Sequence, residues 1–588
     1  MDFNFPILSA LIWIPIVAGV LILFMDQKQR DLYRGVAIAA ATVVLALSAT
    51  VFFTYGSNVR QAAVDAEDAG LVTADDAENV AFYADLVPLI DEEVGKSEAT
   101  TAFVRALAFE ERVTWVEDAG VAYHLGVDGL SAPMVWLTGM VAVAGVLISW
   151  RISDRQREFL AFFMLLVAGV MGVFISVVVF LLFFFYELAI FPMYILIAGW
   201  GWVKLREYAA MKLTLYILVG SVIALVGAIA MYFQAANFFS NEGQAVFNAA
   251  VSSGLLPADS NVHSFSMVQL VLAAENGAFD IPMLGTTFAK VWFPFVFMGL
   301  AVLAGVFPFH NWSPDGHVAA PTAVSMIHAG VLMKVGAFAA LRVGVMLLPS
   351  GAQVHLPWIV FLTLINVVYG AFIAFRQRDF KYVIGFSSVS HMGLVSMGFA
   401  TMNLVGMTGA GLQMFSHGAM TALFFGCVGM VYDRAHTRDL PSLGGFAKVM
   451  PWVAFAFILG GLTSMGMPGL SGFVAEYPIF AGMWQASEQI TLQIGGFTLS
   501  NYYAVIVVIA ALGIVLTAAY VLRVTQQVFF GEFDRAKYPD VGDITARERF
   551  VLIFLGAPLV ILGVAPFVMA PILETGFRPV LAILGVGA

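Results

Sequence analysis

Residues 181–200 read LLFFFYELAIFPMYILIAGW, an apolar run in which Glu187 is the one charged side chain. A helix rises about 1.5 Å per residue, so about twenty apolar residues cross the roughly 30 Å hydrocarbon core of a bilayer. The run therefore predicts a transmembrane helix. Similar runs elsewhere predict an all-α polytopic membrane protein with about 14 transmembrane helices. The run at 181–200 extends back to residue 177. The other runs are 5–25, 35–53, 131–150, 159–175, 209–232, 287–309, 323–348, 355–375, 382–401, 406–432, 451–485, 502–528 and 550–573.

The composition agrees with a chain whose main solvent is lipid. Hydrophobic residues make up 61% of the 588 residues and charged residues 11%, whereas soluble domains contain roughly 25% charged residues. The single cysteine, Cys427, excludes internal disulfides and cysteine-ligated clusters within this chain, so any redox cofactor is expected on a partner. The net charge of −11 argues against a nucleic-acid partner.

Lysine and arginine residues are concentrated in every second loop between the predicted spans. Positive charge is retained on the cytoplasmic side of a membrane. The alternation therefore predicts an even number of spans with both termini extracytoplasmic, in an integral protein of a bacterial cytoplasmic (inner) membrane. No basic residue precedes the first span, so no cleavable signal is predicted. The basic residues of these loops are Lys28, Arg30, Arg34, Arg151, Arg155, Arg157, Lys204, Arg206, Arg376, Arg378, Lys381, Arg434, Arg438, Lys448, Arg535, Lys537, Arg547 and Arg549.

Two predicted spans contain helix-breaking residues. The seventh span has Pro294, Gly305 and Pro308, and the twelfth has GMPGLSG at residues 466–472. Interrupted helices at bilayer depth are tolerated where they line a cavity, and a packing kink is the simpler alternative. The breaks are five spans apart, which predicts two inverted five-helix repeats.

These features divide the chain into six parts. We expect transmembrane helices 1–2 at 1–56, an acidic extracytoplasmic insertion at 57–129, helix 3 and a loop at 130–158, the first inverted repeat (helices 4–8) at 159–348, the second (helices 9–13) at 349–530, and a loop with C-terminal helix 14 at 531–588. A solvated cap over a subunit seam is the simple interpretation of the insertion, and a carboxylate-lined proton or cation antenna is the alternative. Its crowded carboxylates are Asp65, Glu67, Asp68, Asp75, Asp76, Glu78, Asp91, Glu92 and Glu93.

A few ionisable residues fall inside predicted spans, where burial of charge is costly and each such residue is a functional candidate. Protons move along chains of titratable groups whose proton affinities are set apart by neighbouring charge. We therefore expect these residues to form a polar line for proton transfer. Packing roles for single histidines, and a structural buried ion pair for the glutamate and the lysine, are the alternatives. The residues are Glu187, His328, Lys334, His391, His417 and Glu476.

Other chemistry has little support in the sequence. His310 and His317 are seven residues apart across prolines and glycines, unlike the i, i+4 ligand spacing of a metal-binding helix. No nucleophile with its base and no phosphate-binding loop occurs in a recognisable spacing. We expect no catalytic residue, bound cofactor or metal in this chain.

Four stretches carry a family resemblance: FFFYELAIFPMYILIAGWG at 183–201, PFHNWSPDGHVAAPTAVSMIHAGVLMKVGAF at 308–338, DFKYVIGFSSVSHMG at 379–393 and GMPGLSGFVAEYPIF at 466–480. In this order they resemble the antiporter-like subunits shared by respiratory NADH:quinone oxidoreductase (complex I) and the multisubunit cation/proton antiporters. The resemblance runs from about residue 125 to residue 530. The chain ends soon after the last predicted span, without room for a long lateral helix, which favours the M type over the L type.

The resemblance implies roles for particular residues. Glu187 matches the fifth-helix glutamate of the family and Lys334 the eighth-helix lysine. His391 and His417 match the central-axis histidines, and Glu476 matches the twelfth-helix acidic residue. In the family the glutamate modulates the proton affinity of a lysine, and protons leave through the second half-channel.

The resemblance also implies where the redox chemistry takes place. Flavin, iron–sulfur clusters and quinone are expected on partner subunits. The expected partners are other membrane subunits of complex I, including further antiporter-like chains, together with lipid. The isolated chain is expected to catalyse no reaction.

The sequence departs from the family pattern in the seventh span. Leu303 stands where the family usually has a lysine, and Gly305 replaces a proline two residues later. We hypothesise that His328, about two turns before Lys334, replaces the missing proton carrier. Lys290, near the outer edge of the span, is the weaker candidate.

Two classes of function fit these observations. The first is a proton-translocating membrane-arm subunit of an NADH:quinone oxidoreductase, driven by quinone reduction elsewhere in the complex and without redox chemistry of its own. The alternative is a subunit of a multisubunit cation/proton antiporter, or another non-redox proton channel. A purely structural scaffold is a third possibility, and the missing lysine is its best support.

Overall fold

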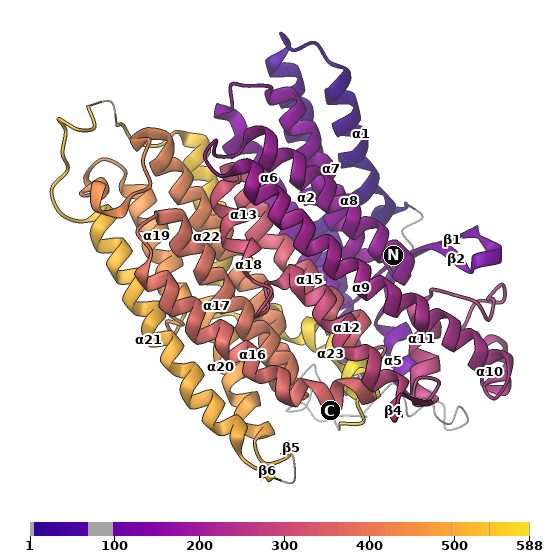
Figure 1. Cartoon of the computed structure of the whole chain (residues 1–588). Helices are drawn as coiled ribbons and strands as arrows, with labels where there is room; N and C mark the ends of the chain where they lie inside the picture. The colour runs from indigo at the N-terminus through magenta and orange to yellow at the C-terminus, as the bar shows by residue number, and fades with distance from the viewer. Residues whose placement is uncertain (1–4, 69–97, 495–496, 540, 587–588) are drawn as a thin grey trace.

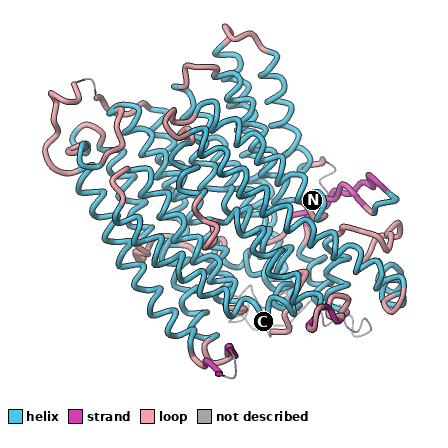
Figure 2. Tube along the Cα trace, viewed as in Figure 1, coloured by secondary structure: helices cyan, strands magenta, loops and turns pink. Residues whose placement is uncertain are grey.

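The computed structural model describes residues 5–68, 98–494, 497–539 and 541–586, which form one bundle of long, roughly aligned helices (Figures 1 and 2). Strands in the described chain are confined to three two-stranded antiparallel hairpins. The all-α membrane architecture expected from the sequence is confirmed.

The elements of the described chain have the following bounds. The helices of the bundle are α1 (Ile7–Phe24), α2 (Arg30–Asp68), α6 (Ser131–Ile148), α7 (Gln156–Ile175), α8 (Val179–Trp200), α9 (Arg206–Ser240), α12 (Phe288–Ala304), α13 (Trp312–Ala319), α14 (Thr322–Ile327), α15 (Met333–Ala339), α16 (Pro349–Arg376), α17 (Phe380–Ala400), α18 (Leu404–Ala435), α19 (Pro451–Ser464), α20 (Ser471–Ala486), α21 (Tyr502–Phe529) and α22 (Ala546–Val564). Shorter helices are α5 (Glu98–Ala106), α10 (Gln244–Ser252), α11 (Met267–Glu275) and α23 (Ala570–Ile583), and the strands are β1 (Ala108–Val116), β2 (Val121–Val127), β3 (Pro282–Met283), β4 (Thr286–Thr287), β5 (Leu492–Ile494) and β6 (Phe497–Leu499). The described chain also has two π-helical turns, η5 (His328–Leu332) and η6 (Ala340–Val345). Its 3-10 turns are η3 (Glu117–Ala119), η4 (Ser149–Arg151), η7 (Leu440–Ser442), η8 (Phe446–Lys448) and η9 (Pro566–Val568).

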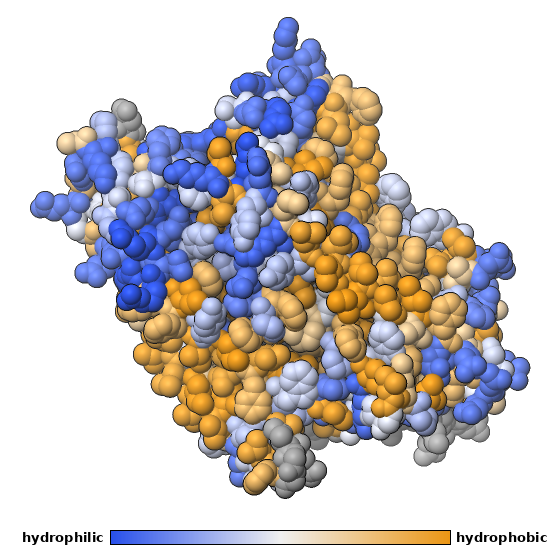
Figure 3. All heavy atoms as spheres, viewed as in Figure 1, coloured by the Kyte–Doolittle hydropathy of each residue, from blue (hydrophilic) through white to orange (hydrophobic). Residues whose placement is uncertain are grey.

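Eleven helical stretches of the described chain are long and apolar enough to cross a membrane. The remaining three predicted spans coincide with the short helix α12, with α19 and α20, which are separated by a break, and with α22, which is charged at its first turn. Figure 3 shows the consequence on the surface, where an orange apolar belt lies between blue polar ends. Large apolar side chains are exposed along α9 and α21, as expected for faces that contact lipid or partner helices.

Several helix ends differ from the sequence-based prediction. Helix α2 continues past residue 57 to Asp68, so the predicted insertion starts as a helical extension. Helix α9 likewise reaches Ser240, and the short helices α10 and α11 were not predicted. Hydropathy marks only the part of a helix inside the bilayer, and a helix continues into water until a breaker stops it. The side chains of the nine insertion carboxylates lie outside the described residues, so both interpretations of the insertion stay predictions.

Both predicted helix interruptions are present. Helix α12 ends at Ala304, followed by Gly305, whose φ of 76° is a left-handed conformation that glycine adopts without strain, and the chain resumes as α13. Helix α19 ends at Ser464, Gly466 and Gly469 follow with positive φ, and α20 begins at Ser471. Each break falls in the fourth helix of a predicted repeat, which supports the inverted-repeat interpretation.

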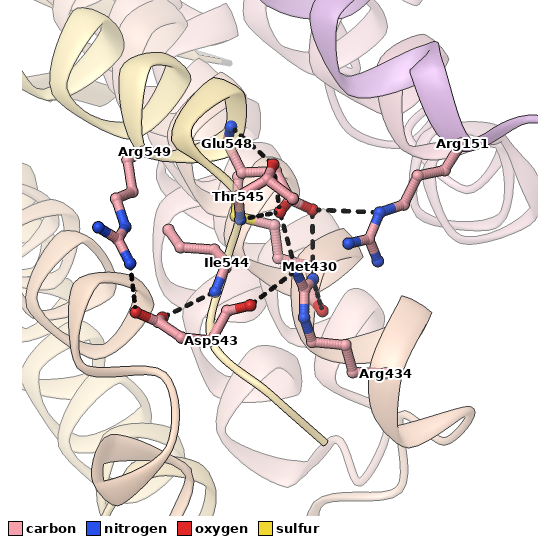
Figure 4. A network of polar contacts seen from close by, with 8 residues as sticks. All are labelled: Arg151, Met430, Arg434, Asp543, Ile544, Thr545, Glu548 and Arg549. Atoms are coloured by element: carbon pink, nitrogen blue, oxygen red, sulfur yellow. Dashed lines mark hydrogen bonds and ion pairs between the residues drawn. The ribbon is translucent and has the colours of Figure 1, made fainter. Parts of the chain in front are cut away.

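The basic loops meet at one end of the bundle. Glu548 accepts hydrogen bonds from Arg434 of α18 at 2.8 and 3.2 Å and lies 3.6 Å from Arg151 at the end of α6 (Figure 4). Its other contacts are with Thr545, which forms a capping box at the start of α22. One carboxylate therefore joins three helix ends that are far apart in the sequence and that carry basic residues of the predicted basic loops.

Candidate functional site

Four of the predicted residues lie along one buried line. Nζ of Lys334 is 2.7 Å from Nδ1 of His417 and donates to the carbonyl of Ala329 at 2.5 Å. The rings of His417 and His391 are stacked with centroids 5.2 Å apart. Nε2 of His391 is 3.5 Å from Oε1 of Glu476. All four side chains are at most 3% exposed, so the line is shielded from lipid.

Glycines allow the helices that carry this line to approach closely. A Cβ at Gly418 of α18 would lie 2.6 Å from the carbonyl oxygen of Gly330 in η5, so these two backbones are in contact. This contact places Lys334 against His417. On the other side, a Cβ at Gly409 of α18 would lie 2.8 Å from the amide of Ile479, which brings α20 and its Glu476 inward.

Lys334 stands between the two π-helical turns of the eighth span, since η5 ends just before α15 and η6 follows it. Turns of this kind occur often at functional sites, where they displace carbonyls from the regular hydrogen-bond ladder. The carbonyl of Ala329, which Lys334 contacts, belongs to η5. The local helix geometry therefore provides a partner for a cation that is fully buried.

His328, at the start of η5, lies beside a second histidine. Its ring centroid is 4.1 Å from that of His317 on α13 and 5.4 Å from the ring of Trp312. Both ring nitrogens of His328 are buried without a hydrogen-bond partner among the described residues. Nε2 of His317 is 3.0 Å from Oγ of Ser313. The two histidines form a buried pair close to Lys334 in the same half of the bundle.

The sequence reasoning missed two buried residues here. His317 was considered only as a metal ligand, and its approach to His328 comes from the turn at Pro321, which reverses the chain between them. The sequence predicts a loop position for Lys381, whereas its side chain is 5% exposed and donates to the carbonyl of Ala320 at 2.5 Å. Its position directly after the N-cap Asp379 and Phe380, at the very start of α17, is the sequence signal for a partly inserted lysine.

The remaining predicted residues are not brought onto the line. Glu187 of α8 is half-buried and accepts a hydrogen bond from Ser221 of α9 at 2.5 Å. Lys290 is half-buried near the start of α12, where its carbonyl is 2.8 Å from His355. The described residues form no ion pair with Glu187 or with Lys334, as a structural buried ion pair would require.

Leu303 fills the position of the missing lysine with a fully buried side chain. Its backbone packs directly against the eighth span, because a Cβ at Gly336 would lie 2.7 Å from the Leu303 carbonyl carbon and 2.4 Å from the Ala304 amide. The seventh span therefore contributes apolar packing, and the titratable groups nearest to Lys334 come from α13, η5, α17 and α18.

Comparison with known proteins places this arrangement in a family. Residues 176–501 match the family model described as NADH:quinone oxidoreductase/Mrp antiporter, transmembrane. NAD(P)H-quinone oxidoreductase chain 4 of Gloeobacter violaceus is 35% identical over 458 residues, covering 78% of this chain and 79% of the relative. NADH-quinone oxidoreductase subunit M of Rhodobacter capsulatus is 33% identical over 470 residues, covering 78% and 82%.

Solved structures share the fold. A chain of respiratory complex I from Thermus thermophilus superposes with a TM-score of 0.74 at 22% identity, over 99% of this chain and all of that chain. A chain of the Mrp complex from Dietzia gives a TM-score of 0.66 at 20% identity, over 96% and 99%. The matched family model spans more than half of the sequence and includes Lys334, His391, His417 and Glu476. The chain is therefore a member of the NADH:quinone oxidoreductase/Mrp antiporter family of transmembrane subunits.

Proposed function

We propose that this chain translocates protons as the M-type membrane subunit of an NADH:quinone oxidoreductase. The observation that carries the proposal is the continuous buried line from Lys334 through His417 and His391 to Glu476. Buried ionisable groups are costly in a membrane protein and typically mark ion or proton pathways. The kinship to quinone oxidoreductase subunits supports this choice of parent complex.

The line suits a relay because neighbouring groups compete for charge. A proton on Lys334 opposes a second positive charge on His417, 2.7 Å away, and the repulsion is strong in a site that excludes water. A conformational change that moves the lysine would release this repulsion and allow the proton to pass toward His391. Glu476, hydrogen-bonded to Gln413 at 3.4 Å, is the acceptor at the end of the line.

We assign the first half of the path to the pair His317 and His328. The pair is buried and includes His328 of the eighth span, the span against which the apolar Leu303, in place of a carrier, packs its backbone. Glu187, which does not contact the line, is assigned the role of a peripheral charge that tunes it from the outer face of α8.

The chain itself holds no redox centre in this proposal; flavin, iron–sulfur clusters and quinone lie on other subunits. Both termini are extracytoplasmic in a bacterial inner membrane.

Purification of the tagged chain from native membranes in mild detergent tests the parent complex. We expect flavin, iron–sulfur signals, and NADH:quinone activity to accompany the chain. Recovery of hydrophobic antiporter-like chains alone, without a redox centre, would instead support the second candidate, a cation/proton antiporter subunit, which the fold similarity to the Mrp complex keeps in view. Sodium-sensitive growth of a deletion strain with normal quinone reductase activity would point the same way.

Replacement of His328 by leucine tests the assignment of the first half-channel. We expect NADH-driven proton uptake by inside-out vesicles to fall about threefold or more, because the relay would lose a carrier at a position where Leu303 offers none. His263→Leu, at an exposed loop histidine, is the matched control and should leave uptake unchanged. Unaltered uptake in His328→Leu would refute the assignment.

A further inference from the structure

A cavity of about 470 Å³ opens at the end of the bundle that carries the basic loops. Its walls come from the ends of α6, α8 and α18, the turn between α13 and α14, and the start of α17. Trp200 and Trp202 lie in its wall, and tryptophan is enriched where a membrane meets water. The ends of several spanning helices and these tryptophans are the features expected at the depth of the lipid headgroups.

The charge around this cavity is predominantly positive. Four cationic side chains and two carboxylates line it. The cations are Arg151, Arg206, Lys381 and Arg438, and the carboxylates are Asp154 and Asp433. Among these groups, Asp154 is 3.3 Å from the guanidinium of Arg155, and Arg151 is 3.6 Å from Glu548, so three cations face one carboxylate without these partners. A cation would be repelled from such a site, whereas an anion would be attracted.

Arg438 is held rigidly in the wall with part of its hydrogen-bonding capacity unused. It is 8% exposed; its Nε is 3.2 Å from Asp379, and Nη1 donates to the carbonyl of Val318 at 3.0 Å. Its guanidinium also stacks over Trp202 at 4.3 Å. Nη2 is buried and has no hydrogen-bond partner among the described residues, and the same is true of Nε of Arg206. Buried donors without acceptors are costly, so an acceptor from outside the chain would be stabilising here.

We propose that this cavity binds a phosphate group, supplied by the headgroup of an anionic phospholipid. The planar guanidinium of Arg438 and the ammonium of Lys381 offer the donors that phosphate oxygens accept. Trp200 and Trp202 place the site where a headgroup would arrive from the bilayer with its acyl chains directed outward. Free phosphate has the same chemistry, and the site is separate from the line that begins at Lys334.

Photolabelling of the assembled complex tests this site. The complex is reconstituted in phosphatidylcholine vesicles that contain a phosphatidylglycerol with a diazirine close to its glycerol backbone, and labelled peptides are mapped by mass spectrometry. We expect labelling of residues 199–206 to fall about fivefold in Arg438→Gln and in Arg206→Gln, as loss of one charge-assisted hydrogen bond predicts. Arg378→Gln, at a largely exposed arginine of the same end, should label like the wild type.

Two further arms separate the sources of the anion. A phosphatidylcholine carrying the same diazirine should label these residues several-fold less than the phosphatidylglycerol. Radiolabelled inorganic phosphate should bind the detergent-purified complex only weakly; tight binding that is lost in Arg438→Gln would assign the cavity to a soluble anion and overturn the lipid assignment. Equal labelling by both lipids, or labelling that persists in Arg206→Gln, at a half-buried arginine of the cavity wall, would overturn the proposal itself.

Discussion

Replacement of Lys334 by methionine is expected to reduce NADH-driven proton translocation about tenfold or more, since an increase of only about 1.4 kcal/mol in a transfer barrier is enough for a tenfold loss. Lys334 is fully buried and contacts His417, and it follows His328 of the His317–His328 pair by six residues in the eighth span. Methionine preserves the volume and the apolar stem but cannot hold a proton. Quenching of a pH-sensitive dye by inside-out vesicles, normalised to the amount of assembled complex, measures the effect.

A matched control separates loss of the relay from loss of a lysine. Lys448→Met removes a lysine from an exposed basic loop and should leave translocation unchanged. Quinone reductase activity should fall together with translocation in Lys334→Met if the two processes are tightly coupled, and assembly should remain normal. Full translocation by Lys334→Met would contradict the proposed line, because that line begins at the Lys334 ammonium, 2.7 Å from His417.

The sequence was a good guide to the spans but a poor guide to their ends. Apolar runs located the transmembrane helices because the bilayer requires them, as at 181–200. The ends depend on individual breakers and on water-exposed segments, so α12 stops at Ala304, before Gly305, instead of residue 309, and α9 continues to Ser240. Neither difference could be predicted from hydropathy, which is insensitive to the helix outside the bilayer.

The candidate site was predictable where rarity was the signal. Lys334, His417, His391 and Glu476 were found because few ionisable residues fall inside apolar runs. His317 was missed because its contact with His328 depends on the reversal at Pro321. Glu187 was expected on the same line, but the lateral position of a helix within a bundle is not encoded in its own periodicity. The glycine contacts between η5 and α18 decide which side chains meet.

Replacement of Asp128 by alanine is expected to destabilise the chain more than any other single change considered above. Asp128 forms an ion pair with Arg342 of η6, and both side chains are at most 3% exposed. Its Oδ1 also accepts hydrogen bonds from the amides of Leu130 and Ser131 at the start of α6. Removal of one partner leaves a buried guanidinium uncompensated, which costs about 3–5 kcal/mol. The temperature at which the purified complex loses this chain on native gels should fall accordingly.

Two further variants decide whether the cost comes from the unpaired charge. Asp259→Ala breaks a surface ion pair with Arg112. Hydrogen bonds from Arg112 and Thr114 hold the pKa of Asp259 below its ordinary value. An exposed pair of this kind contributes only about 0–1 kcal/mol to stability, so this variant should lose little. Asp128→Leu combined with Arg342→Met removes both buried charges, and should recover most of the lost stability because an apolar pair needs no compensation. A double variant as unstable as Asp128→Ala would instead assign the cost to the hydrogen bonds of Asp128 with Leu130 and Ser131. Recovery would show that the pair serves to fix the eighth span, and with it Lys334, against the end of the β1–β2 hairpin.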